Sequence, residues 1–128
     1  MRLISLGAVF LATGIGFGAF GAHAFKGILV GDAARWYATA VDYHLLHGVG
    51  LMAIGLGQVG GAESKWLSRG VGLMIGGTLI FSGCLYTMAL SGNRGLGAVV
   101  PIGGTSLILA WCSIAWGFWA KGDGPRGI

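Results

Sequence analysis

The sequence has very few charged side chains. Its 128 residues include 8 Lys or Arg and 4 Asp or Glu, so charged residues make up 9% of the chain, against about a quarter in an ordinary soluble domain. So few charges cannot cover the surface of a soluble domain of this size. An apolar content of 55% excludes a disordered chain. The composition therefore predicts an integral membrane protein.

Cysteine and proline are also scarce. The 2 cysteines, Cys84 and Cys112, both lie inside apolar runs, which predicts small apolar side chains rather than a disulfide or a four-ligand zinc site. Glycine is abundant at 27 residues but follows no three-residue period, which excludes collagen. The apolar runs do not alternate with polar residues over about ten positions, as the strands of a membrane β-barrel do.

The charges divide the chain into four long charge-free intervals. These are residues 3–25, 43–62, 70–93 and 95–120, and a bilayer core of about 30 Å needs roughly 20 helical residues. We therefore predict an all-α fold, a four-helix transmembrane bundle that forms a single domain over residues 1–128. The predicted helices cover about 3–22, 36–58, 70–90 and 96–120. Asp32 is the predicted N-cap of the second helix.

The basic residues predict the orientation of the chain in the membrane. One side would hold five of them and the other side three: Arg2, Lys65, Arg69, Lys121 and Arg126 against Lys26, Arg35 and Arg94. This excess favours both termini in the cytoplasm. The basic residues form no cluster or stripe, so we expect no nucleic-acid partner. Trp111, Trp116 and Trp119 are predicted to anchor the last helix at the membrane interface.

Small residues mark the predicted contacts between helices. Gly14, Gly18 and Ala22 recur every four residues and share one face of the first helix. Small residues let helices approach closely, which favours association in lipid, where no hydrophobic force operates between them. We expect a helix-packing role for four further glycines: Gly72, Gly76, Gly103 and Gly104.

Polar residues at membrane depth are costly, so each one requires a reason. Tyr43 and His47 share one face of the second helix, whereas His44 points elsewhere, and the end of the first helix must lie on their side of the membrane. The predicted polar cluster contains residues from three helices: His23, Asp42, Tyr43, His47, Ser82 and Tyr86. Two interpretations stay open, because these side chains could fix helix packing by hydrogen bonds or line a path for a solute. Asp42 could equally pair with Arg35 or Arg94, or be solvated.

The sequence contains few residues in patterns typical of metal binding or catalysis. His44 and His47 are three residues apart and could bind a metal or haem, but no third ligand has a firm position. We therefore expect no metal and no cofactor. No nucleophile–base pair, phosphate-binding loop, CxxC pair or HExxH motif is present, so we expect no enzyme.

Four segments resemble the domain of unknown function 423 family, whose members are small bacterial membrane proteins with eukaryotic relatives. These segments cover Gly18–His23, Thr39–His47, Phe81–Ser91 and Pro101–Gly104, and the resemblance spans about residues 5–118. It implies four helices and a location in the plasma membrane, without a known reaction. The polar positions typical of the family correspond to His23, Tyr43, His47, Ser82 and Tyr86 in this chain, whereas His44 departs from the pattern.

Three hypotheses about function follow. In the first, the chain is a small membrane subunit that assembles with itself or with another membrane protein, surrounded by lipid. The second is a channel or carrier for a small solute, lined by the polar cluster. The third is a membrane protein with a histidine-bound metal or haem.

Overall fold

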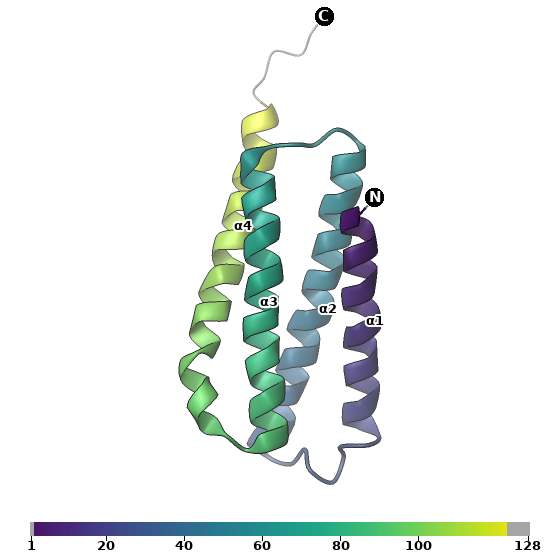
Figure 1. Cartoon of the computed structure of the whole chain (residues 1–128), viewed down its shortest axis with the longest axis vertical. Helices are drawn as coiled ribbons and strands as arrows, with labels where there is room; N and C mark the ends of the chain where they lie inside the picture. Colours follow the sequence, from purple (N-terminus) through teal and green to yellow (C-terminus); the bar gives the residue numbers. More distant parts are fainter. Residues whose placement is uncertain (1, 123–128) are drawn as a thin grey trace, which may run out of the picture.

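The computed structural model describes residues 2–122, and this part of the chain is helical without strands. Its elements are four long helices and one short 3-10 helix: α1 (Arg2–Ala22), α2 (Asp32–Val59), α3 (Lys65–Ser91), η1 (Arg94–Ala98) and α4 (Val100–Gly122). The long helices run antiparallel and side by side (Figure 1). The all-α prediction is confirmed for these residues. Arg126, which contributed to the predicted orientation, lies outside the described residues.

Three helix starts differ from the predicted ones: α2 begins at Asp32 rather than at about 36, α3 at Lys65 rather than at about 70, and α4 at Val100 rather than at about 96, because η1 precedes it. α3 begins at Lys65, five residues before the predicted start, because the Ser64 side chain caps it by accepting a hydrogen bond from the Leu67 N–H at 3.1 Å. Asp32 is not the N-cap of α2 but its first residue, and Gly31 takes the cap position with φ 57°. The Asp32 carboxylate pairs with Arg35 and Arg94 instead of capping the helix.

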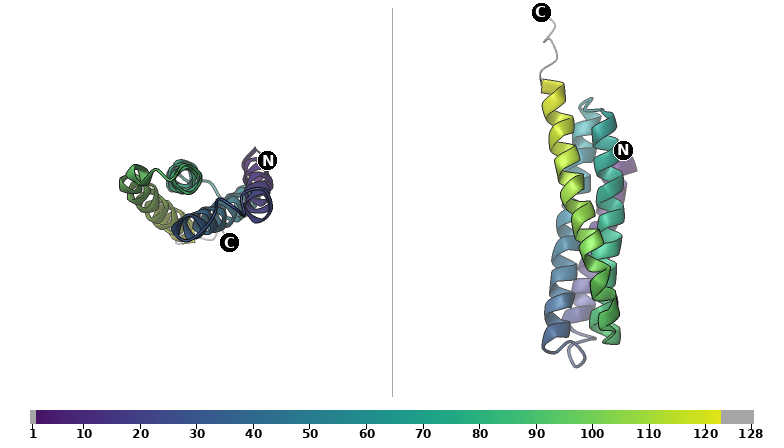
Figure 2. Two further views of the ribbon diagram at one scale, coloured as in Figure 1. Left: turned by 90° about the horizontal axis from the view of Figure 1, so that it is seen from below. Right: turned by 90° about the vertical axis from the view of Figure 1, so that its left-hand side faces the viewer.

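The four helices form an open, curved row rather than a closed ring. Within residues 2–122, Cα atoms of different long helices approach within 8 Å only between α1 and α2, α2 and α3, and α3 and α4. The end-on view of Figure 2 places α1 and α4 at opposite ends of this row. The row therefore has two grooves, one between α1 and α3 and one between α2 and α4, and each is open on one side.

Glycines make the close contacts of the first pair of helices. A Cβ built on Gly7 would lie 2.9 Å from the Gly48 carbonyl oxygen, and one built on Gly14 would lie 2.7 Å from Leu45. Gly18 faces Val41 at 3.5 Å. Ala22, which was predicted on the same face, is exposed. The backbones of α1 and α2 thus meet where no side chain keeps them apart.

The contact between α3 and α4 uses a different glycine face of α3 from the predicted one. A Cβ on Gly77 would lie 3.1 Å from the Gly103 carbonyl oxygen, and one on Gly103 would lie 2.6 Å from the Phe81 nitrogen; Gly104 also faces Phe81. By contrast, a Cβ on Gly72 or Gly76 meets no atom within 4 Å. Gly72 and Gly76 therefore make no contact between helices within the described residues, because the face of α3 that meets α4 carries Gly77 instead.

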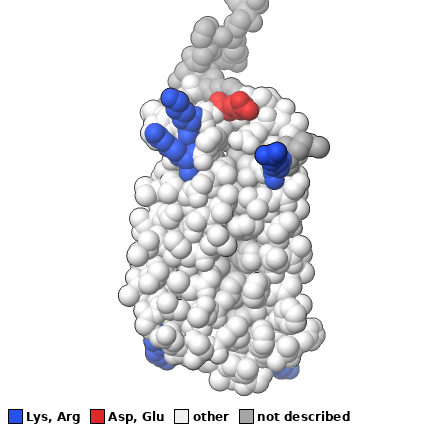
Figure 3. Space-filling view, in the orientation of Figure 1, with Lys and Arg blue, Asp and Glu red and all other residues white. Residues whose placement is uncertain are grey.

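Apart from Asp42 within α2, the charged side chains of the described residues lie near the two ends of the molecule. On the face seen in Figure 3, a broad uncharged band separates the blue and red atoms at one end from the blue atoms at the other. Three helical segments among the described residues are long and apolar enough to cross a membrane: Arg2–Ala22, Lys65–Ser91 and Arg94–Ala120. α2 is 28 residues long but is less apolar, because Asp42, His44 and His47 lie within it.

Candidate functional site

His47 is fixed between two helices with both ring nitrogens occupied. The ring is 2% exposed; its Nδ1 lies 2.6 Å from the Tyr43 carbonyl oxygen and its Nε2 lies 3.2 Å from the Trp111 Nε1. A carbonyl only accepts and an indole N–H only donates. His47 is therefore the neutral tautomer with the proton on Nδ1, and Trp111 donates to Nε2. Trp111, which was predicted to anchor the helix at the interface, instead makes this contact.

His44 lies in the groove between α1 and α3, and its hydrogen bonds join three helices. Its Nδ1 lies 3.3 Å from the Tyr86 hydroxyl of α3, and its Nε2 lies 3.3 Å from the Thr13 hydroxyl of α1. Thr13 donates its own proton to the backbone, with the Val9 carbonyl oxygen at 2.8 Å. Its oxygen therefore accepts from His44 Nε2–H, and Tyr86 donates to Nδ1.

The sequence predicted His44 only as a possible metal or haem ligand and left it out of the polar cluster, although it is the central residue of this chain of hydrogen bonds. Thr13 carried the signal that could have revealed it, because Thr13 is the one polar residue in the apolar run from residue 6 to residue 22 of α1. Its hydroxyl lies at the α1–α2 contact that Gly14 creates, where a Cβ on Gly14 would lie 3.5 Å from the His44 ring.

Aromatic rings surround the His44–Tyr86 pair. The Phe17 ring stacks on Tyr86 with centroids 4.5 Å apart and an interplanar angle of 19°. Phe10 meets His44 edge to face at 5.5 Å. Tyr37 contacts Tyr86 at 5.1 Å and donates its hydroxyl proton to the Phe17 carbonyl oxygen at 2.6 Å. These contacts give the groove between α1 and α3 apolar aromatic walls.

Ser82 opens into the same groove without a hydrogen-bond partner. The residue is 2% exposed, and its Oγ is the one buried side-chain polar atom of the described residues that has no partner. It lines a cavity of about 220 Å³ that includes residues of α1, α2 and α3: Phe10, Phe17, His44, Thr78, Leu79, Ser82, Gly83 and Tyr86. A buried hydroxyl left unpaired is costly, so this cavity is the candidate site of the molecule.

Tyr43 and His47 belong to the other groove, between α2 and α4. The Tyr43 ring lies 5.8 Å from the His47 ring and 4.4 Å from the Phe81 ring. With Trp111, these residues line a cavity of about 400 Å³. The residues predicted to form one cluster are thus divided, with Ser82 and Tyr86 in one groove and Tyr43 and His47 in the other.

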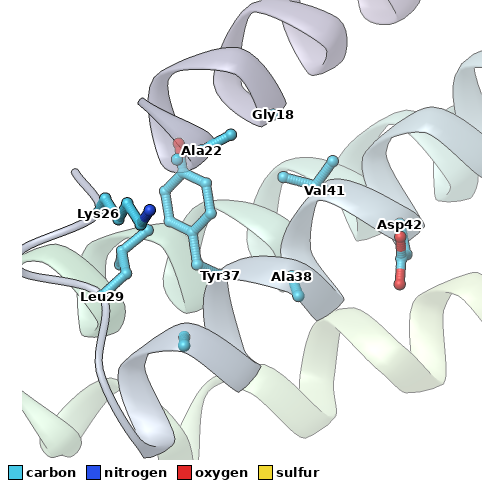
Figure 4. Close-up of a pocket in the computed structure, with 10 residues that line it drawn as sticks. Gly18, Ala22, Lys26, Leu29, Tyr37, Ala38, Val41 and Asp42 are labelled. Atoms are coloured by element: carbon cyan, nitrogen blue, oxygen red, sulfur yellow. The ribbon is translucent and has the colours of Figure 1, made fainter. Parts of the chain in front are cut away.

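His23 and Asp42 lie in neither groove. His23 is exposed in the connection after α1. Asp42 is exposed on α2 and lines a pocket of about 480 Å³ near that connection. Figure 4 shows Lys26 and Asp42 at opposite ends of this pocket, with Tyr37 and Val41 between them.

The ion pairs of this end of the molecule form on Asp32 and not on Asp42. Arg35 pairs with the Asp32 carboxylate, and Arg94 reaches it from η1 at 3.2 Å. The hydrogen bond and charge of Arg35, with a smaller contribution from Arg94, hold the pKa of the Asp32 carboxyl below its ordinary value. The prediction that Asp42 pairs with Arg35 or Arg94 is therefore wrong. The alternative prediction, that Asp42 is solvated, agrees with its exposed position.

The histidines have no arrangement that a metal would need. Among the described residues, no group of three His, Cys, Asp or Glu side chains is close enough to hold a metal ion. Cys84 and Cys112 are both free, and Cys112 is exposed rather than buried. Both ring nitrogens of His44 and His47 already have protein partners, so the described geometry gives no support to the metal or haem hypothesis.

The apolar helices and the charge-free band define the chain as a helical membrane protein. The sequence profile of the family described as "protein of unknown function (DUF423)" matches residues 17–104, and the chain belongs to this family. It is 40% identical over 108 residues to a UPF0382 membrane protein of Staphylococcus epidermidis, a match that covers 84% of this chain and 87% of that protein.

Further relatives come from other bacteria. The UPF0382 membrane protein YwdK of Bacillus subtilis is 34% identical over 119 residues, covering 87% of this chain and 90% of that protein. A UPF0382 membrane protein of Haemophilus influenzae is 30% identical over 117 residues, covering 91% of this chain and 90% of that protein. No solved structure matches the chain.

Proposed function

We propose that the chain is a four-span membrane subunit that packs against a second copy of itself through one outer face of α3. We define the outer α3 stripe as Gly72 and Gly76. A catalytic role is not part of the proposal, because the imidazoles of His44 and His47 are already hydrogen-bonded within the protein.

The fourth span is α2. It has 28 residues, or about 42 Å of helix, and it lies between two helices that are apolar enough to span. The polar atoms of His44 and His47 are hydrogen-bonded to neighbouring helices or to the backbone. These two histidines therefore place no unsatisfied polar group in lipid, which is the usual obstacle to a polar residue in a spanning helix. The exposed Asp42 lies only about 15 Å from the start of α2, and the helix exceeds a bilayer core of about 30 Å by about 12 Å, so this carboxylate lies toward one end of the span.

The observation that carries the self-assembly proposal is the open space beside the outer α3 stripe. A Cβ on Gly72 or Gly76 meets no atom within 4 Å, whereas Gly70 and Gly77 on the other side of the same helix are in close contact with Ile114 and Leu107 of α4. Glycines spaced by four residues on a lipid-facing helix favour close approach of another helix. A second copy of the chain would fill this space.

The orientation that we propose places both termini in the cytoplasm of a bacterial plasma membrane. Figure 1 shows the start of α1, the α2–α3 connection and the end of α4 at one end of the molecule. Four of the basic residues up to Lys121 belong to these segments and three to the opposite end. The surplus supports this orientation, because short cytoplasmic segments carry an excess of Lys and Arg.

Native mass spectrometry from lipid nanodiscs or single-molecule photobleaching in vesicles tests the proposal. Gly76→Leu is expected to shift the protein from dimer to monomer without loss of helix, because nothing in the monomer occupies that space. Gly16→Leu is the matched control, since Gly16 of α1 also meets no atom within 4 Å, and it should leave the dimer unchanged. A wild-type monomer, or equal behaviour of the two variants, would refute the proposal.

A further inference from the structure

We propose that the cavity between α1 and α3 binds an uncharged, lipid-soluble molecule with a single ring that carries a hydroxyl group. We call it the Ser82 cavity, after the unpartnered hydroxyl that opens into it. The inference concerns a ligand and does not rest on self-association.

The polar groups of the cavity match a hydroxyl group on the ligand. The Ser82 O–H is a free donor, because its oxygen has no partner in the protein. The Tyr86 O–H is already donated to His44, which leaves the Tyr86 oxygen as an acceptor. A ligand hydroxyl can accept from Ser82 and donate to Tyr86, and so satisfy both. An ether or a hydrocarbon could not do both.

The cavity has no charged side chain in its described lining, which excludes ionised ligands. No Lys, Arg, Asp or Glu is among the described residues that line it. A carboxylate or an ammonium group would enter a low-dielectric site without a counter-charge, which is strongly unfavourable. A neutral phenol satisfies the hydrogen bonds without this cost.

The size and walls of the cavity match one ring. An apolar cavity of roughly 150 Å³ in another protein holds benzene, so about 220 Å³ accommodates a ring with small substituents. Phe10 and Phe17 offer edge and face contacts to such a ring. Leu79 at the rim is 63% exposed on a helix apolar enough to cross a membrane, so the opening faces the lipid and a ligand would enter from the bilayer.

The test compares 4-fluorophenol with 4-fluorotoluene, two rings of similar size of which only the first has a hydroxyl. Fluorine-19 NMR measures the binding of each to the protein in lipid nanodiscs, and empty nanodiscs correct for partition into lipid. We expect saturable binding of 4-fluorophenol, about fivefold tighter than that of 4-fluorotoluene, since one hydrogen bond to a buried group contributes about that much.

Two variants locate the hydrogen bonds. Ser82→Ala should remove the preference for the phenol, and Tyr86→Phe should reduce it. Ser106→Ala should keep it, because the Ser106 hydroxyl donates to the Leu73 carbonyl oxygen outside this cavity. Equal binding of the two rings to the wild type, no saturable signal, or a preference that survives Ser82→Ala would overturn the proposal. Repeating the titration on Gly76→Leu separates this result from any effect of dimerisation.

Discussion

The hydrogen bond between Trp111 and His47 offers a direct test of how α4 is held to α2. The Cα atoms of these two helices do not approach within 8 Å, so the contact depends on long side chains. Trp111→Phe removes the donor and leaves the buried Nε2 of His47 without a partner. We expect this change to lower the free energy of unfolding by about 1–3 kcal/mol, the usual cost of a buried group left unpaired.

A double-mutant cycle isolates the hydrogen bond from packing. His47→Leu keeps much of the side-chain volume but removes the acceptor, and Trp111→Phe is measured in both backgrounds. Hydrogen bonds between transmembrane helices give coupling energies of about 0.6 kcal/mol on average and up to about 1.7 kcal/mol. His47 is 2% exposed and accepts the indole N–H of Trp111, so we expect a value in the upper half of that range.

The assay is reversible unfolding in mixed micelles by increasing SDS, followed by far-UV circular dichroism. Trp116→Phe is the control on the same helix, because Trp116 is 51% exposed and should cost little. A coupling energy within about 0.3 kcal/mol of zero, which is the scatter of independent sites, would refute the assigned hydrogen bond.

Three further outcomes are expected. Nitrogen-15 NMR of the imidazoles should show opposite neutral tautomers, with the proton on Nδ1 in His47 and on Nε2 in His44; a shared tautomer would contradict the assigned donors. Gly77→Ala should destabilise the protein by about 1–3 kcal/mol in SDS unfolding, because its Cβ would lie 2.9 Å from Leu107, whereas Gly16→Ala should not destabilise it. Asp32→Asn should be less stable than the wild type at neutral pH. The folded-state pKa of Asp32 lies below its ordinary value of 3.8, so the stabilisation is present above that value and fades as the pH falls through the folded-state pKa; a difference that persists at low pH would argue against the ion pairs as its source.

The spacing of charges predicted the helices well, because a long apolar interval has few alternatives to a helix. It missed the first turns of α2 and α3, where charged residues continue the helix beyond the apolar run. Lys65 lies in α3 because Ser64 caps the helix. A cap is a local signal that the spacing of charges does not contain. Asp32 has the right residue type for a cap, but Arg35 and Arg94 compete for its carboxylate.

Of the six residues predicted to form one polar cluster, only Ser82 and Tyr86 line the candidate site. Ser82 and Tyr86 were found because polar side chains are rare at membrane depth. The sequence could not show which histidine bonds to Tyr86. His44 and His47 are less than one helical turn apart, and only the packing of the neighbouring helices places them in different grooves. The glycine contacts decide between them, because Gly14 brings α1 to the side of α2 that carries His44.

The open row of helices and the unpaired Ser82 hydroxyl have a common explanation. In water, the exposed apolar walls of the two grooves would drive the row to close, but lipid tails solvate such walls as well as another helix does. The helices of the α1–α2 and α3–α4 pairs therefore stay close where glycines permit contact, as at Gly7, Gly14 and Gly77. Lipid tails can fill the groove between α1 and α3, but they cannot satisfy a buried hydroxyl. A neutral ligand with a hydroxyl of its own gains the hydrogen bond that neither water nor lipid supplies there, and this difference is what would select it from the bilayer.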